Sequence, residues 1–240
     1  MLEAGLWGLG AGSALVIGAM LGLWGRVSRR NVALAMAFGA GALISALAFD
    51  LTEDAFAHGG TLPVAGGLAA GALAFFIGDQ LLHARGAARR GPRMGQVGTN
   101  GPAIVLGALL DGIPESVVLG STLLAGVGVG LPFVAAVFVS NVPEALSAAN
   151  DLKREGHRAG WIIRLWIGVA LVSGIAAALG YWLLGELNGA IPLIQSFAAG
   201  AILTMLADTM IPEAFDEGGD LTGLATVFGF ALAFLLSTVS

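Results

Sequence analysis

Long apolar runs alternate with short polar or glycine-rich breaks along all 240 residues of the chain. A helix needs roughly 20 apolar residues to cross a hydrocarbon core about 30 Å thick, and the runs have about this length. We therefore predict an all-α integral membrane protein with one transmembrane domain, residues 1–240, made of eight spans. The predicted spans are 4–25, 31–57, 62–83, 100–125, 131–152, 159–184, 190–216 and 221–238.

The composition agrees with this pattern. Hydrophobic residues make up 57% of the chain and charged residues only 11%, whereas a soluble domain carries about 25% charged residues. The 38 glycines lie mostly within apolar runs and indicate close helix packing. The absence of cysteine excludes disulfides and thiolate metal sites. The first residues lack the positive region of a signal peptide, so we expect the first run to stay as a span.

The basic residues mark one side of the predicted bundle. All eleven fall at three breaks, within residues 26–30, 85–93 and 153–164, which lie on the same side of an eight-span chain. The positive-inside rule makes that side cytoplasmic and puts both termini outside, in a multi-pass protein of the plasma (inner) membrane. We interpret residues 85–93 as a solvated loop that sets topology rather than a nucleic-acid or lipid-headgroup site. The tryptophans, mostly near span ends, are expected to be interfacial anchors.

The chain also contains an internal repeat. One constant offset aligns 38–42 with 197–201, 55–60 with 214–219 and 72–75 with 231–234. A single offset that serves three successive spans predicts that spans one to three repeat as spans six to eight. Five spans separate each pair, so the copies should have opposite orientations, as in many secondary transporters.

Spans four and five carry similar polar motifs in apolar surroundings. Residues 111–115 read Asp-Gly-Ile-Pro-Glu, and residues 140–144 read Ser-Asn-Val-Pro-Glu. Asp111 lies about 15 Å into its span, near the bilayer midplane. Spacings of three and four residues put the polar groups of each motif on one helix face. Each proline frees a carbonyl four residues back, at Leu110 or Val139, which can then face a ligand.

Three carboxylates near the midplane need compensation. An ionised carboxylate there is costly, and like charges repel, so the group persists only with a cation or with bound protons. Neither span contains a basic residue. Carboxylate, amide, hydroxyl and carbonyl oxygens suit a divalent metal ion. The alternative is that protonated acids hydrogen-bond between helices and that the prolines only kink them.

Further acids lie where the second and seventh spans end. Such clusters concentrate cations and could pass them on, although solvated helix ends carry similar residues. Asp54 accompanies the first cluster, and Asp216 and Glu217 accompany the second. The predicted entry and exit residues are Asp50, Glu53, His58, Asp208 and Glu213.

These features resemble the ZIP (Zrt/Irt-like) family of divalent-metal transporters. The likeness rests on eight spans arranged as three, two and three, on outward termini, and on the paired Pro-Glu motifs. Residues 196–200, leading to 211–214, also look like the family's seventh span. The resemblance covers the whole chain and implies a binuclear or single metal site between spans four and five. It further implies a homodimer and an elevator-like movement of spans one, four, five and six against the others.

The family's fourth-span motif, His-Asn-x-Pro-Glu, falls on residues 111–115, so Asp111 replaces the histidine and Gly112 the asparagine. The fifth-span motif falls on residues 140–144 and keeps the glutamate. These changes, and the lack of a carboxylate deep in span six, suggest a divergent bacterial-type member with one principal ion. The implied metal ligands are Asp111, Glu115, Asn141 and Glu144, with Ser140 as a weaker candidate.

The expected function is transport of Zn, Fe, Mn or Cd ions toward the cytoplasm by alternating access. The ion is the substrate, membrane lipid surrounds the protein, and we expect no enzymatic activity, organic cofactor or nucleic-acid partner. One alternative is a channel or a receptor that binds metal without carrying it. Another is an intramembrane aspartyl protease that uses Asp111 and Asp208, although its Gly-x-Gly-Asp pattern is missing and only Gly78-Asp79 comes near it.

Overall fold

The computed structural model describes residues 1–84, 101–125, 130–185 and 189–239. Every regular element in these ranges is a helix, which confirms the predicted all-α class, and the described breaks lie within a few residues of those predicted. The predicted topology-setting loop at residues 85–93 lies outside the described residues, as do most of the breaks near residues 126 and 187. Two elements, η1 and η3, are π-helical, and η2 and η4 are short 3₁₀ turns. The elements are α1 (Leu2–Trp24), α2 (Arg29–Ala46), η1 (Leu47–Thr52), α3 (Glu53–Gly59), α4 (Thr61–Ala84), α5 (Gly101–Thr122), η2 (Leu123–Ala125), α6 (Leu131–Arg154), α7 (Ala159–Gly185), α8 (Ile191–Met205), η3 (Leu206–Met210), α9 (Ile211–Gly218), η4 (Gly219–Leu221) and α10 (Thr222–Val239).

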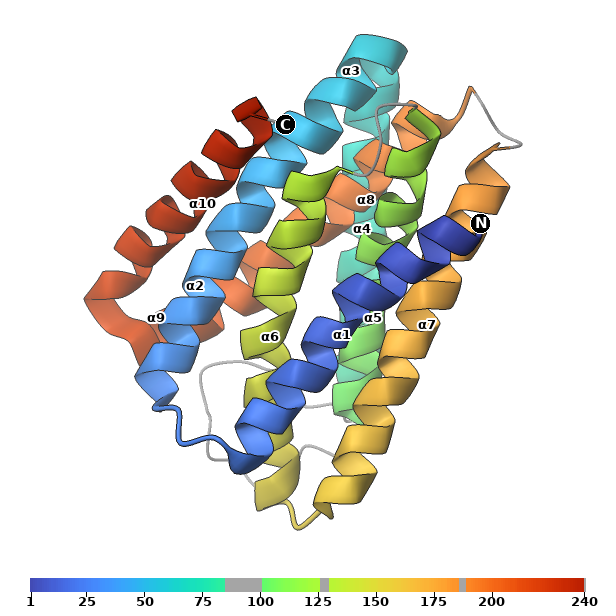
Figure 1. Ribbon diagram of the computed structural model, residues 1–240. Coiled ribbons are helices and arrows are strands. Elements are labelled where there is room, and N and C mark those ends of the chain that lie inside the picture. The colour runs from blue at the N-terminus through green and yellow to red at the C-terminus, as the bar shows by residue number, and fades with distance from the viewer. Residues whose placement is uncertain (85–100, 126–129, 186–188, 240) are drawn as a thin grey trace.

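Six segments of the described chain are long and apolar enough to cross a membrane, which makes this a multi-pass membrane protein. The last of them contains 49 residues and includes both α8 and α10, which run in opposite directions in Figure 1. Large apolar side chains such as Leu62 and Phe228 are mostly exposed, as lipid-facing residues are. The six segments are Leu2–Trp24, Arg29–Gly59, Thr61–Leu81, Leu131–Arg154, Ala159–Gly185 and Ile191–Val239.

Local sequence signals explain where the helices begin and end. The Ser28 hydroxyl caps α2 by accepting a hydrogen bond from the backbone N–H of Asn31 at 3.2 Å. Pro132 stands in the first turn of α6, where its missing N–H costs nothing. Gly60 and Gly219 end α3 and α9 with positive φ values of 74° and 64°, a conformation that glycine adopts without steric cost.

Two long helices are each interrupted by a π-turn. The helix α2 continues through η1 into α3, and α8 continues through η3 into α9. In η1 the Thr52 hydroxyl donates to the Leu47 carbonyl at 2.7 Å, and in η3 the Thr209 hydroxyl donates to the Met205 carbonyl. Such turns occur frequently at functional sites. They carry two of the predicted entry and exit acids, Asp50 and Asp208.

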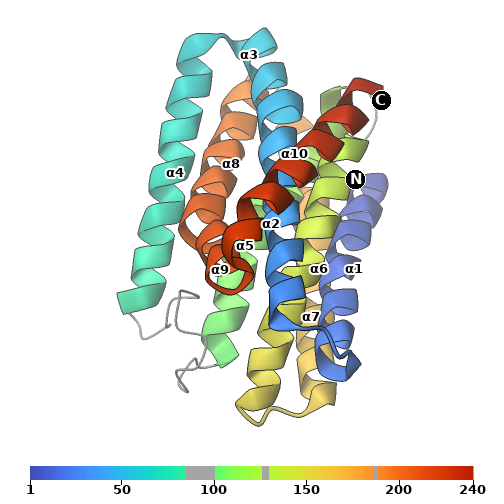
Figure 2. The same cartoon turned by 90° about the vertical axis from the view of Figure 1, so that its left-hand side faces the viewer.

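The helices form two groups. The first, here the α1 group, contains α1, α5, α6 and α7, in which α1 packs against α6 and α7, and α5 packs against α7. The second, here the α2 group, contains α2, α3, α4, α8, α9 and α10, in which α2 packs against α10 and α4 against α8. The groups meet mainly where α2 contacts α6 and where α5 contacts α8. Figure 2 shows α4 and α8 on the left and α6 and α1 on the right, with α10 crossing in front of the bundle toward the upper right.

Glycines let α1 lie directly on α6. A Cβ atom on Gly18 would overlap the carbonyl oxygen of Val142, and one on Gly22 would lie 2.6 Å from that of Leu146. This small-xxx-small spacing is the usual device for close packing of membrane helices. The Lys153 ammonium of α6 also donates to the Leu23 carbonyl at the end of α1 at 2.6 Å. The helix α1 is thereby fixed against the α6 turn that carries the Pro-Glu motif.

One tryptophan does not lie at an interface. Trp24 and Trp182 are 64% and 53% exposed, but Trp166 is completely buried. It packs in a cluster with Leu15 of α1 and Ala145 of α6. The prediction of an interfacial anchor is wrong for Trp166, because small residues on the neighbouring helices leave room for its indole ring inside the bundle.

Candidate functional site

Both Pro-Glu motifs lie on helices of the α1 group and face the interior. Glu115 of α5 is 3% exposed and Glu144 of α6 is 8% exposed. Each follows a proline inside its helix, Pro114 or Pro143, so the backbone hydrogen bond to the carbonyl four residues back is missing. Two acidic side chains are therefore buried in the middle of apolar helices, next to carbonyl groups released from the helix pattern.

Glu115 stands at the centre of this cluster. The side-chain amide of Asn141, which is 6% exposed, donates a hydrogen bond to the Glu115 carboxyl, and the charges of Glu144 and Asp111 act on it directly. Asp111 itself is half-buried. Glu115 thus interacts with the other three main predicted ligands, which lie on its own helix and on α6. Their oxygens provide carboxylate and amide groups, the ligand types that hard divalent ions prefer.

Ser140, the weaker candidate, is placed differently. It is fully buried, and a Cβ atom on Gly39 of α2 would lie 2.7 Å from its Cα. Its hydroxyl donates to the Val137 carbonyl of its own helix at 2.9 Å. Ser140 therefore lies where the two helix groups touch, and its hydroxyl would have to leave Val137 to reach a metal ion.

Among the residues that the structure describes, no group of three or more histidine, aspartate or glutamate side chains converges closely enough to hold a metal ion. The carboxylates of α5 and α6 are neighbours, but they do not converge on one position that an ion could occupy. Binding one ion with oxygens from both helices would therefore require these side chains to move inward.

The predicted entry residues lie along η1 and α3. The Asp50 Oδ2 atom is one of two buried side-chain atoms in the described chain without a hydrogen-bond partner. Glu53 is exposed. His58 pairs with Asp54, with 3.2 Å between Nδ1 and Oδ1. The second Asp54 oxygen accepts a hydrogen bond from Nε2 of Gln195 on α8 at 3.2 Å.

The predicted exit residues lie along η3 and α9. Asp208 is exposed, whereas Oε1 of Glu213 accepts a hydrogen bond from the Ser147 hydroxyl of α6 at 3.1 Å. Glu217 pairs with Arg29 at the start of α2, also at 3.1 Å. The acids of each cluster thus differ in exposure, and Asp54, Glu213 and Glu217 are paired with other side chains.

Sequence reasoning missed two buried polar partners, Gln195 and Ser147, which are 2% and 6% exposed. Ser147 could have been noticed because it lies three residues after Glu144, on the same helix face. Gln195 stands near the start of an apolar span, and nothing in its neighbourhood along the sequence points to Asp54.

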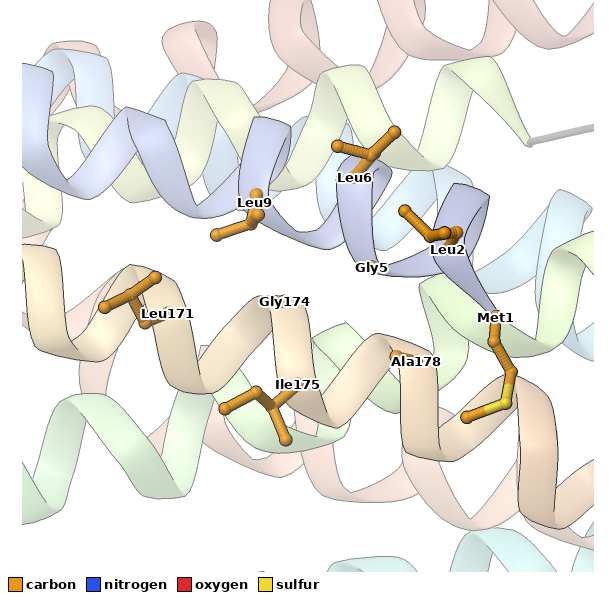
Figure 3. Close-up of a pocket in the computed structure, with 9 residues that line it drawn as sticks. All are labelled: Met1, Leu2, Gly5, Leu6, Leu9, Leu171, Gly174, Ile175 and Ala178. Carbon is orange, nitrogen blue, oxygen red and sulfur yellow. The ribbon is translucent and has the colours of Figure 1, made fainter.

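A groove on the outside of the bundle has a different character. It lies between α1 and α7 and is shown in Figure 3 with its nine lining residues, among them Leu2, Leu6, Leu171 and Ile175. Its lining side chains are all apolar. It therefore offers no ligand for an ion, and the buried cluster at Glu115 remains the candidate site.

Comparisons with known proteins give one informative relative. No protein-family model matches the chain. The zinc transporter ZIPB of Bordetella bronchiseptica is 28% identical over 136 residues, which cover 56% of this chain. The match covers 44% of the relative's length, so the chain spans less than half of that protein. This similarity confirms the resemblance that the sequence motifs indicated.

Proposed function

We propose that this chain, whose sequence is similar to a ZIP-family zinc transporter, is itself a transporter of divalent metal ions. The observation that carries the proposal is the burial of Glu115 and Glu144 beside each other on two proline-containing helices, with Asn141 bonded to Glu115. An acidic residue at the centre of a membrane helix costs about 3 kcal/mol on insertion scales, and neighbouring like charges add to that cost. A divalent cation would offset both terms.

The proposed ligands are Asp111, Glu115, Asn141 and Glu144, with Ser140 in a weaker role. Because every one of these ligands binds through oxygen, the site suits Mn or Fe ions and also accepts Zn and Cd. One principal ion fits this set. The carbonyls released by the two prolines can complete its shell.

The proposal includes eight crossings with inverted repeats. Its support is that the π-turns η1 and η3 begin at Leu47 and Leu206, and that the turning glycines Gly60 and Gly219 have the same separation along the chain. This separation equals the offset of the sequence repeat. Successive long segments also alternate in direction in Figure 1, and both termini lie at the same end of the bundle in both views.

Mirrored helix contacts also support the repeat. Gly41 of α2 lies against the Thr226 carbonyl of α10, and Gly200 of α8 lies against the Leu68 carbonyl of α4. Gly71 and Gly229 make the reciprocal contacts with Phe197 and Phe38. The contacting residues of α2 and α8 are separated along the chain by the offset of the sequence repeat. The contacting residues of α4 and α10 are separated by one residue fewer. The contacts of α5 with α7 and of α6 with α1 form another such pair.

In this mechanism the α1 group carries the ion past the α2 group, in an elevator-like movement toward the cytoplasm. Asp50, Glu53 and His58 would attract cations at the outer mouth, and Asp208 and Glu213 would receive them at the inner one. Both termini would lie outside the cytoplasm. A homodimer, which the family resemblance implies, belongs to the same proposal.

Uptake by purified protein in liposomes tests the function. We expect saturable uptake of Zn, Mn, Fe or Cd ions, at least tenfold slower in Glu115→Gln and Glu144→Gln. Glu3→Gln, at the exposed start of α1, is the matched control and should behave like the unchanged protein. Unchanged uptake in both site variants would contradict the proposal. Uptake without saturation would indicate a channel, and binding without uptake a receptor.

A further inference from the structure

One hydrogen bond joins the two helix groups near the candidate site. The hydroxyl of Ser147 on α6 donates to Oε1 of Glu213 on α9 at 3.1 Å. Ser147 is 6% exposed, so water competes little for this bond. The helix α6 belongs to the α1 group and α9 to the α2 group, so the bond crosses the surface along which the groups would move.

The bond lies between the carboxylate cluster and one end of the bundle. Ser147 follows Glu144 by three residues and is on the same face of α6. The remaining residues of α6 lead to the end where loops 25–28 and 155–158 lie (Figure 1). That end carries Arg26, Lys153 and Arg158 and is the cytoplasmic end by the positive-inside rule.

The opposite end has no equivalent donor at the corresponding position. In the proposed repeat Glu213 corresponds to Asp54, which accepts a hydrogen bond from Gln195 of its own group. On α5 the counterpart of Ser147 is Val118, which follows Glu115 at the same spacing as Ser147 follows Glu144. Valine has no hydroxyl group, so the sequence provides this bond at one end only.

We propose that the Ser147–Glu213 hydrogen bond is a one-sided latch, which holds the two groups together at the end bearing the basic loops. This inference rests on the proposed function, because a latch matters only if the groups move. The bond must break before the ion cluster can open toward that end. A hydrogen bond to a charged acceptor favours the closed state by about tenfold or more.

The rate of thiol labelling measures the latch, since the chain contains no natural cysteine. A single cysteine replacing Asn150, one turn beyond Ser147 on the same face of α6, reports access from that end. Adding Ser147→Ala should raise its maleimide-labelling rate about tenfold. Ser147→Thr keeps a hydroxyl and should restore slow labelling. Ser121→Ala removes a buried hydroxyl that bonds within its own helix and should change nothing.

A second variant separates the latch from a general loosening of the fold. Glu213→Gln weakens the same bond, so it should also speed labelling, and the double variant with Ser147→Ala should label no faster than the faster single variant. Additive effects, or unchanged labelling in Ser147→Ala, would overturn the latch. Zn²⁺ binding is measured in the same samples. If Ser147→Ala binds Zn²⁺ normally and its labelling rate is unchanged, only the latch proposal is refuted. If Glu115→Gln does not impair uptake, the proposed transport function is refuted.

Discussion

The side-chain amide of Asn141 on α6 donates a hydrogen bond to the Glu115 carboxyl on α5. This contact links the two Pro-Glu motifs, which lie on separate helices and have a similar order of polar residues. In the proposed site the two helices act together, so substitutions on either helix should alter the binding of the same ion.

Replacement of Asn141 tests this link. Asn141→Leu keeps the number and branching of the heavy side-chain atoms but leaves Glu115 without its donor and removes one oxygen ligand. We expect metal affinity to fall by about tenfold and the free energy of unfolding to fall by about 1–3 kcal/mol. Calorimetric metal titration and thermal unfolding in detergent measure the two effects. Asn141→Asp restores an oxygen and should recover metal binding, and equal loss in both variants would contradict the ligand role.

The ligand at position 111 should set which metal is preferred. Asp111→His replaces a carboxylate by an imidazole, which binds Zn and Cd better than Mn. We expect the ratio of zinc to manganese uptake to rise by about tenfold in a competition assay. Asp79→His, which introduces histidine at a half-buried position on α4, should leave the ratio unchanged. An equal change in both variants would show that position 111 is not special.

Metal affinity should depend on pH. Protons and metal ions compete for the same carboxylate oxygens, so binding a metal releases protons and the apparent affinity falls as the pH is lowered. Titrations between about pH 5.5 and 7.5 measure the slope. Because Glu144→Gln removes one competing group, its slope should be shallower. An affinity independent of pH would mean that these carboxylates do not bind the ion.

The contact of α1 with the site turn should be sensitive to one added carbon atom. A Cβ atom on Gly18 would overlap the Val142 carbonyl, whereas a Cβ on Gly10 meets nothing within 4 Å. Gly18→Ala should therefore lower stability by about 1–3 kcal/mol and displace the α6 turn, with weaker metal binding. Gly10→Ala is the matched control and should keep or slightly raise thermal stability.

Topology can be tested in the cysteine-free chain. Single cysteines at Thr61 and at Gly160 should label from opposite faces of the membrane, with position 160 reached from the cytoplasm. Intact cells treated with an impermeant thiol reagent provide the measurement. Both positions are exposed in the first turns of α4 and α7, so access should not limit the reaction. Labelling from the same face would contradict the eight-span arrangement.

The sequence by itself determined the helical class, the membrane location and the positions of the breaks. Apolar runs of about 20 residues have the length of a membrane-spanning helix, in which every backbone hydrogen bond is made within the segment. Glycines such as Gly60 and prolines such as Pro132 mark helix ends because their backbone preferences are local. Glu115 and Glu144 were identifiable for a similar reason, since an acidic residue within an apolar span is expensive wherever the helix packs.

Only the tertiary structure decided which side chains meet. Trp166 is buried rather than interfacial, and Ser140 lies against Gly39 of α2. Ser147 donates a hydrogen bond to Glu213, and Gln195 donates one to Asp54, although the members of each pair are far apart in the sequence. Such pairings depend on which helices become neighbours, and in these helices that choice follows from the fit of glycines against backbone carbonyls. The hydropathy of the sequence does not predict which helix faces pack together, because lipid-facing and helix-facing surfaces are equally apolar.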